Sequence, residues 1–283
     1  MTSQLKTGLL LGLLTAIILF FGQALGGQSG LILAFGLAVI MNVSSYWFSD
    51  KIVLSMYRAT EVPPDQGHRL YAIVSDLARR AQLPMPKVYI IPEQAPNAFA
   101  TGRNPAHAVV AVTQGLLQLM NENEIRGVLA HEMGHIKNRD ILIQSVAATL
   151  GGAIMMIANI VKWGAIFGMG RSDDEGGNPF AALALAIIAP LAAMLIQMGI
   201  SRSREFLADQ TGARLAGNPH FLANALEKLS AYSQRVPMRQ GNPSSAHLFI
   251  VNPFSAQSIA GLFSTHPPTE ERIRRLRNMT TFT

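Results

Sequence analysis

The most constraining feature of this chain is a long interval without charge. From Thr7 to Ser49, 43 consecutive residues include no Lys, Arg, Asp, Glu or His. A helix needs about 20 apolar residues to cross a bilayer, so the interval is long enough for two crossings. The glycines between Gly22 and Gly30 would form the turn that joins them. The pattern predicts a transmembrane hairpin over residues 1–50. A cleaved signal peptide is the alternative, but a second apolar stretch would not follow it at once.

A second pair of uncharged stretches lies further along the chain. Residues 141–161 and 176–201 contain no charged side chain, and a short polar loop separates them. We therefore predict a second transmembrane hairpin over residues 141–200. The alternative is a pair of buried helices in a soluble domain. The polar residues Asn159 and Lys162 favour this alternative.

The uncharged stretches divide the chain into four parts. These are a hairpin at residues 1–50, the first part of a polar domain at 51–140, a hairpin at 141–200 and the second part of the polar domain at 201–283. Residues 50–140 contain 10 Lys and Arg, residues 201–283 contain another 10, and the two expected turns contain only Arg171. Because basic residues near membrane ends favour the cytoplasm, both termini and the polar domain of this multi-pass protein are predicted to be cytoplasmic.

Composition narrows the possible functions. The chain has no cysteine, which excludes disulfide frameworks, zinc fingers, thiol proteases and iron–sulfur sites. Its formal net charge is +6, and the positive excess lies in the C-terminal part, beside the expected membrane surface. We expect these charges to contact anionic lipid headgroups, so the lipid bilayer is a predicted partner and nucleic acid is not.

Hydrophobic periodicity predicts an α+β organisation for the polar domain. Helices are predicted at 65–82, from Asn121 onward, and at 201–216, 219–233 and 268–278. Strands are predicted at 87–91, 97–102 and 107–112, joined by short loops into a small β-meander with one open edge. Asn121 is a good helix cap because Glu124, three residues later, completes a capping box.

The motif that carries chemistry lies in the helix that begins at Asn121. His131 and His135 are four residues apart, so their imidazoles share one helical face and can bind a single zinc ion. Glu132 lies one position around the helix, where it can act as a general base on a water molecule. The alternative is a pair of surface histidines on an amphipathic helix.

A catalytic zinc site needs a third protein ligand. The candidates are Glu205, Asp209, His107, His220, His247 and His266. Glu205 and Asp209 are four residues apart on one predicted helix, so one carboxylate can bind the metal while the other orients a histidine. A hairpin returns the chain to the membrane face that it left, so His135 and Glu205 should meet there.

Four segments together resemble a known family. They are Asn-Ala-Phe-Ala-Thr-Gly at 97–102, His-Glu-Met-Gly-His at 131–135, Ser-Arg-Glu-Phe-Leu-Ala-Asp at 203–209 and Thr-His-Pro-Pro-Thr-Glu-Glu-Arg-Ile at 265–273. In this order they closely resemble the HtpX-type membrane zinc metalloproteases, which are related to the CAAX prenyl proteases. The resemblance runs nearly from end to end. It implies a mainly α integral membrane protein with two transmembrane hairpins and a zincin-like α+β catalytic domain.

The resemblance also implies roles for individual residues. One zinc ion per chain would be bound by His131, His135 and Glu205. Glu132 would be the general base, and Asp209 would support a ligand from the second shell. The edge strand that pairs with the substrate backbone would comprise Asn97, Ala98, Phe99 and Ala100. Two further residues are candidates for stabilising the oxyanion, His266 and Arg272, and Arg272 is also a candidate for pairing with a carboxylate.

The implied function is a zinc metalloendopeptidase of the bacterial inner membrane that degrades misfolded or damaged membrane proteins in the stress response. Two other classes fit parts of the sequence. A channel or transporter could have four spans, but these spans contain almost no ionisable residues, which solute pathways usually need. A non-proteolytic scaffold or chaperone could use zinc to hold its fold, but Glu132 would then have no role. The scaffold is the second hypothesis.

Overall fold

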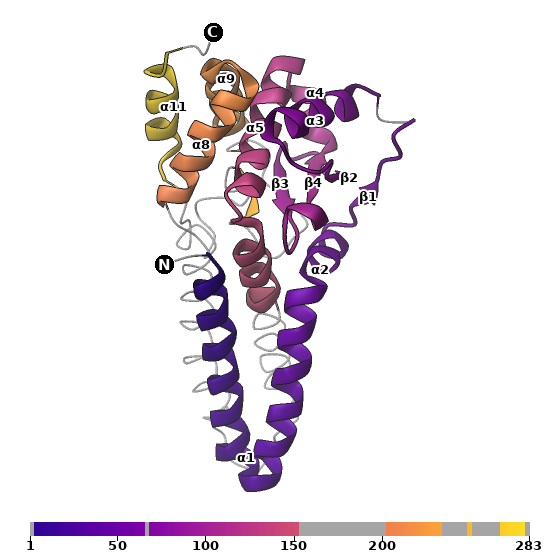
Figure 1. The fold of residues 1–283 in the computed structure, drawn as a ribbon, viewed down its shortest axis with the longest axis vertical. Coiled ribbons are helices and arrows are strands. Elements are labelled where there is room, and N and C mark those ends of the chain that lie inside the picture. Colours follow the sequence, from indigo (N-terminus) through magenta and orange to yellow (C-terminus); the bar gives the residue numbers. More distant parts are fainter. Residues whose placement is uncertain (1–2, 66–67, 153–201, 234–247, 251–266, 281–283) are drawn as a thin grey trace, which may run out of the picture.

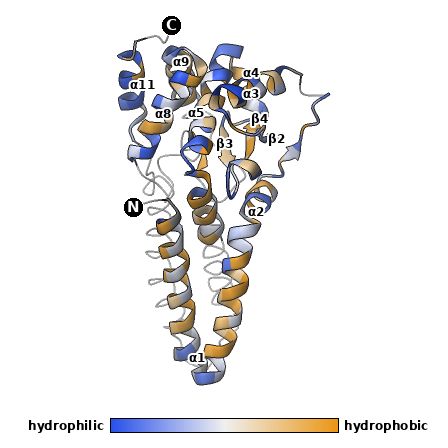
Figure 2. Ribbon diagram, in the orientation of Figure 1, coloured by the Kyte–Doolittle hydropathy of each residue, from blue (hydrophilic) through white to orange (hydrophobic). Residues whose placement is uncertain are grey.

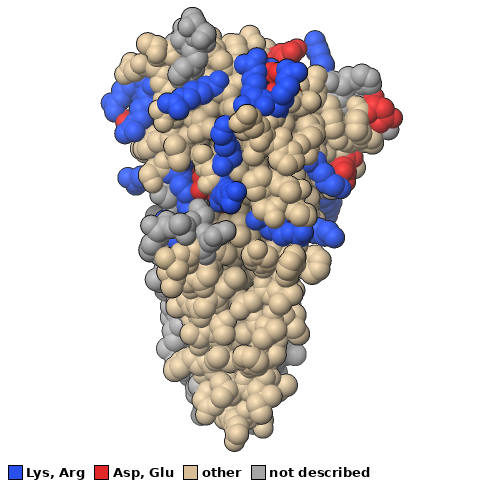
Figure 3. All heavy atoms as spheres, viewed as in Figure 1, with Lys and Arg blue, Asp and Glu red and all other residues tan. Residues whose placement is uncertain are grey.

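The computed structural model describes residues 3–65, 68–152, 202–233, 248–250 and 267–280. The molecule is elongated, with a helical stalk at one end and a head of helices and one sheet at the other (Figure 1). The stalk is mostly apolar (Figure 2), and on the face seen in Figure 3 its described part shows neither basic nor acidic side chains.

The stalk is built from one long helical segment, α1 (Ser3–Trp47), which folds back on itself at Gly27. Gly27 has φ 55° and ψ −140°, a conformation that favours glycine. The two arms are joined by a 2.8 Å hydrogen bond from Asn42 Nδ2 to Thr15 Oγ1. Residues 3–47 therefore form two helical arms, and a transmembrane hairpin over residues 1–50 stays a prediction. The second arm, Gly27–Trp47, is long and apolar enough to span a membrane.

Only the beginning of the predicted second hairpin can be described. A helix over Ile141–Gly152 runs from the head into the stalk and lies between the arms of α1 (Figure 1). Its residues Val146 and Leu150 pack against Leu10 and Leu14 of α1. Residues 153–201 lie outside the described part of the chain, so the second hairpin stays a prediction.

The sheet of the head has four strands, β1 (Thr60–Glu61), β2 (Lys87–Ile91), β3 (Ala98–Thr101) and β4 (Val109–Thr113). Their order is β1-β2-β4-β3, with β2 parallel to β4 and the other pairs antiparallel. The predicted β-meander is wrong, because a meander would place β3 between β2 and β4. The strand in that inner position is instead β4, whose five residues are all buried and mostly β-branched, as suits a strand with a neighbour on each side.

Five of the described helices of the head lie where the sequence predicts them, and two short ones, at Ser49–Met56 and Gln114–Leu119, were not predicted. In chain order these helices are α2 (Ser49–Met56), α3 (His68–Ala81), α4 (Gln114–Leu119), α5 (Glu122–Lys137), α8 (Arg202–Ala216), α9 (Pro219–Ser233) and α11 (Thr269–Arg277). The capping box between Asn121 and Glu124 forms as predicted at the start of α5. The predicted strand 107–112 begins two residues later than expected, because Pro105–His107 form a 3-10 turn.

The main hydrophobic core lies between one face of the sheet and α3, α5, α8 and α9. A smaller core on the other face joins the sheet to α2 and to Ala148 of the helix at Ile141–Gly152. As a result α5, which carries the histidine motif, lies in the centre of the head (Figure 1).

Candidate metal centre

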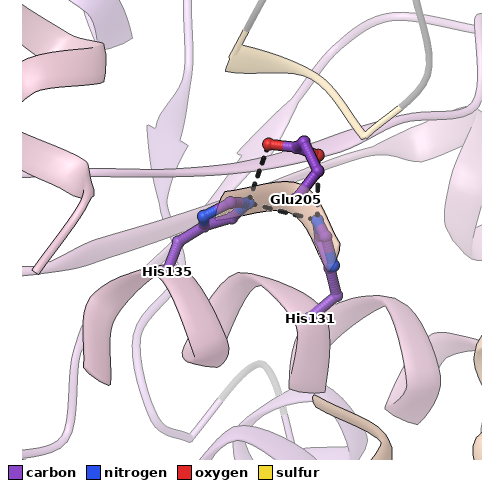
Figure 4. Close-up of side chains that lie close together, drawn as sticks. All are labelled: His131, His135 and Glu205. Atoms are coloured by element: carbon purple, nitrogen blue, oxygen red, sulfur yellow. Dashed lines mark hydrogen bonds and ion pairs between the residues drawn. The ribbon is translucent and has the colours of Figure 1, made fainter. Parts of the chain in front are cut away.

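The site depends on an unusually close approach of α5 and α8. Glycines make this approach possible, since a Cβ atom on Gly212 would lie 2.8 Å from the backbone of His131, and one on Gly134 would lie 2.9 Å from the Ala208 carbonyl oxygen. The two helices therefore pack backbone against backbone at the histidine motif. This packing brings Glu205 of α8 over the face of α5 that carries His131 and His135 (Figure 4).

Three side chains from these helices converge on one point. One ligand atom from each of His131, His135 and Glu205 lies within 4.8 Å of the others. The two Nε2 atoms are 3.2 Å apart, and the Glu205 carboxylate oxygens lie 3.7 Å from His131 Nε2 and 3.5 Å from His135 Nε2. All three residues are buried. Imidazole and carboxylate groups are common ligands of divalent transition metals, so these three residues are suited to bind a metal ion.

A second carboxylate supports each histidine from behind. The Nδ1 atom of His131 is 2.9 Å from an Asp209 oxygen, and that of His135 is 3.6 Å from an Asp140 oxygen. Both rings therefore turn Nε2 toward the cluster and Nδ1 toward an aspartate, an arrangement common behind metal-binding histidines. The sequence prediction included Asp209 and missed Asp140. The sequence feature that could have indicated Asp140 is its position, since it is an acidic residue directly before the uncharged stretch that begins at residue 141.

The C-terminal helix α11 contributes a buried arginine to the same site. Arg272 is 1% exposed, and its Nε and Nη2 atoms donate to the two oxygens of Asp209 at 2.9 and 2.7 Å. Its Nη1 atom lies 3.8 Å from a Glu205 oxygen. The structure thus places Arg272 in a pair with a carboxylate, which was one of the two roles considered for it.

Comparison with known proteins identifies the family. The profile of Peptidase family M48 matches residues 64–280. The chain belongs to this family. It is 60% identical over 280 residues to "Protease HtpX homolog" of Desulforapulum autotrophicum, covering 98% of this chain and 90% of the relative. It is 58% identical over 282 residues to the protein of the same name from Syntrophobacter fumaroxidans, covering 99% and 100%. The resemblance to HtpX-type proteases is confirmed.

A solved structure supports the fold. A crystal structure of Ste24p from S. mikatae matches with a TM-score of 0.52 over 95% of this M48 peptidase and 62% of the longer Ste24p chain. At 19% identity this likeness concerns the fold alone. The two chains therefore share a fold, and the arrangement of any spans within a bilayer stays a prediction.

The predicted general base of the M48 peptidase lies beside the metal cluster. Glu132 is 1% exposed, and burial raises its pKa to about 7. The backbone of Ala100, in β3, hydrogen-bonds its carboxylate and moderates this rise in pKa, as does the charge of His135. Glu132 therefore lies between the metal cluster and the strand that the sequence predicts to bind substrate.

The histidine and aspartate side chains of the cluster have strongly shifted pKa values. Burial lowers the pKa of His131 to about 4, and the charge of Arg272 adds to this effect. Burial also opposes the charging of His135, but Glu205 and Asp140 outweigh it and raise the pKa of His135 to about 9. For Asp209, Arg272 and His131 outweigh burial and lower the pKa to about 2.

The predicted edge strand is at an edge, and its outer side is partly covered. Among the strands that the structure describes, β3 pairs with β4 alone. On the outer side, the Ile250 N–H donates to the Ala98 carbonyl oxygen at 3.3 Å, and the Ile250 carbonyl accepts a 2.8 Å bond from Arg272 Nη1. Phe249 is fully buried between Tyr57 and Phe99. The open edge predicted from sequence is thus shared with residues 248–250 of the same chain.

Two of the other histidines considered as ligands, His107 and His220, lie in the described part of the chain and are not part of the cluster. His107 contacts Asn104 and Arg103 on the surface, and the His220 ring lies 3.3 Å from Arg277. His247 and His266 lie outside the described residues, so the predicted oxyanion role of His266 stays a prediction.

Proposed function

We propose that this M48 peptidase is a membrane-bound zinc endopeptidase that hydrolyses misfolded or damaged membrane proteins at the cytoplasmic face of the membrane. The observation that carries the proposal is the convergence of His131, His135 and Glu205 with Glu132 buried beside them. Two histidines and one glutamate are a known ligand set of catalytic zinc, which leaves one position for water or substrate.

Each residue then has a distinct task. When bound, a zinc ion supplies Lewis acidity that polarises a peptide carbonyl and makes water a better nucleophile at neutral pH. Glu132 takes a proton from the attacking water and delivers it to the leaving amine. A pKa of about 7 suits both steps, because a group that titrates near the working pH can accept and release a proton. Asp209 keeps His131 oriented through its Nδ1 atom.

Substrate binding is proposed to follow the backbone of β3. A peptide added to a sheet edge is held mainly by main-chain hydrogen bonds, so the enzyme would cleave unfolded chains with weak sequence preference. Such a peptide would pass Ala100, whose backbone hydrogen-bonds Glu132.

Membrane proteins are the proposed substrates because the edge strand is tied to the stalk. Ser145, in the helix that enters the stalk, has its Oγ 2.7 Å from Thr101 Oγ1 and accepts a 3.2 Å bond from the Gly102 N–H. A strand fixed at this place lies next to the membrane surface if the stalk is embedded. The basic residues of the head support a cytoplasmic orientation.

The activity is tested with detergent-purified wild type, Glu132→Gln and the control Glu122→Gln, which changes an exposed glutamate of the same helix. Zinc content and cleavage of unfolded casein are measured for each. We expect about one zinc per chain in all three and a loss of cleavage of at least about 100-fold in Glu132→Gln alone. Zinc binding without cleavage by the wild type would favour the scaffold hypothesis. Absence of zinc from the wild type would refute the ligand assignment.

The orientation is tested with single cysteines, because the natural chain has none. Ser29→Cys lies beside the turn of α1, and Thr60→Cys lies in the head. A membrane-impermeant maleimide added to intact spheroplasts should label Ser29→Cys, and should label Thr60→Cys only after lysis. The reverse pattern would place the catalytic head outside the cytoplasm.

A further inference from the structure

We propose that Asp140 is a positioning residue for the second histidine ligand, and that it links the metal centre to the base of the predicted second hairpin. The inference rests on the proposed function only in taking His135 to be a metal ligand. It assigns a role to a side chain outside the His-Glu-Met-Gly-His motif at 131–135.

The first observation is the direction of the His135 ring. Its Nε2 atom faces Glu205 at 3.5 Å, and its Nδ1 atom faces Asp140 at 3.6 Å. Asp140 is only 2% exposed, so its carboxylate acts on the ring with little screening by water. A carboxylate behind Nδ1 keeps the proton on that nitrogen and leaves the lone pair of Nε2 for a metal.

The second observation is the backbone turn that delivers this carboxylate. At the end of α5 the Arg139 N–H donates to the Ile136 carbonyl at 3.1 Å, and the Asp140 N–H donates to the His135 carbonyl at 3.0 Å. These two bonds are the pattern of a Schellman cap. In this cap the first of the two N–H donors belongs to a residue with a left-handed backbone, which is usually glycine. Here that residue is Arg139, with φ 58°. The turn therefore returns Asp140 to the residue whose ring it faces.

The third observation places the same carboxylate between two segments far apart in sequence. Its other oxygen lies 3.9 Å from Nε of Arg204, which directly precedes Glu205 in α8. Asp140 itself directly precedes the helix at Ile141–Gly152. The Asp140 carboxylate thus faces His135 and Arg204 at the start of α8, and the residue itself directly precedes the segment that enters the stalk.

Asp140 and Asp209 therefore face the Nδ1 atoms of the two histidines from opposite ends of the cluster, Asp209 at 2.9 Å and Asp140 at 3.6 Å. Asp209 holds His131 from α8 and is itself fixed by Arg272. Asp140 holds His135 from the end of α5 and pairs with Arg204. Loss of either carboxylate should weaken metal binding without removing a ligand.

The test uses full-length, detergent-purified wild type, Asp140→Ala, Asp140→Asn and the control Asp76→Ala. Asp76 is another ion-paired aspartate of the head, bound to Arg79, Arg80 and Arg126 away from the cluster. Zinc affinity is measured by competition with a chelator, the ligand field by the visible absorption of the cobalt(II)-substituted protein, and fold stability by thermal unfolding of the metal-free protein.

We expect Asp140→Ala to weaken zinc binding about 10- to 100-fold and to alter the cobalt spectrum. Asp140→Asn should recover most of the affinity, because its amide oxygen can still accept from Nδ1. Asp76→Ala should lower thermal stability and leave zinc affinity and the cobalt spectrum unchanged.

The proposal is overturned if Asp140→Ala binds zinc like the wild type. It is also overturned if Asp140→Asn binds zinc as weakly as Asp140→Ala and both variants lose affinity only in proportion to their loss of stability. Since no substrate is used, a wild type that binds zinc but cleaves nothing would refute the peptidase function and leave this result standing.

Discussion

Arg272 donates hydrogen bonds to both oxygens of the Asp209 carboxylate, although the two residues are 63 positions apart in the chain. The pair is buried and touches the metal cluster through His131 and Glu205. It connects the C-terminal helix α11 to α8, so the end of the chain takes part in organising the site.

Removal of Arg272 should destabilise the fold. Arg272→Met leaves the Asp209 carboxylate buried without its cation, and breaking a buried ion pair in this way typically costs about 3–5 kcal/mol. Thermal unfolding of the metal-free protein in detergent measures the change. Arg275→Met is the matched control, since Arg275 is an exposed arginine of the same helix, and it should leave the unfolding temperature nearly unchanged. Equal stability of the two variants would show that the buried pair contributes nothing.

Metal binding should release about one proton at pH 7. In the metal-free protein His135 has a pKa of about 9 and is protonated at this pH, whereas His131, with a pKa of about 4, is already neutral. A metal must displace the proton from His135, so affinity should rise with pH by about tenfold per unit between pH 7 and 9 and then level off. Calorimetry in two buffers of different ionisation enthalpy counts the protons. Binding without proton release at pH 7 would mean that His135 is neutral before the metal arrives.

Gly212→Ala should separate α5 from α8. The added Cβ would lie 2.8 Å from the backbone of His131, and backbone cannot move aside as a flexible side chain can. We expect lower thermal stability and weaker metal binding, because Glu205 would be displaced from the two histidines. Gly36→Ala is the control, since a Cβ there meets nothing within 4 Å and alanine is favoured over glycine in a helix. Unchanged zinc affinity in Gly212→Ala would show that the helices can adjust.

Ser145→Ala should uncouple the edge strand from the stalk. The change removes the partner of the Thr101 hydroxyl and of the Gly102 N–H, and an unpaired buried polar group costs about 1–3 kcal/mol. Casein cleavage should fall while zinc content stays constant. Thr149→Ala, one turn further along, removes only a bond to its own helix and should retain activity. Loss of activity in both variants would indicate a general effect on this helix.

The sequence predicted the metal cluster because its information is local. The spacing of His131 and His135 determines a helical face, and the capping box at Asn121 determines where that helix begins. Glu205 was one of several candidates for the third ligand, and the resemblance to HtpX-type proteases selected it. The first hairpin was equally visible, since 43 residues without charge leave few other folds.

The features that the sequence did not predict are non-local. Which of β2, β3 and β4 takes the inner position is settled by non-local pairing, and strand order cannot be read from three apolar runs of similar length. The contact of Asp140 with His135 depends on a left-handed turn at Arg139, where no glycine marks the position. The bond from Ile250 to Ala98 joins segments about 150 residues apart and leaves no periodic signal.

The order of the ligands along the chain has a consequence for biosynthesis. His131 and His135 leave the ribosome before Glu205, with the whole segment 141–200 between them, and Arg272 follows near the end. A nascent chain that stops short of residue 205 has two of its three metal ligands and no way to complete the set. The three residues can therefore converge on one metal ion only after the central apolar segment has been synthesised.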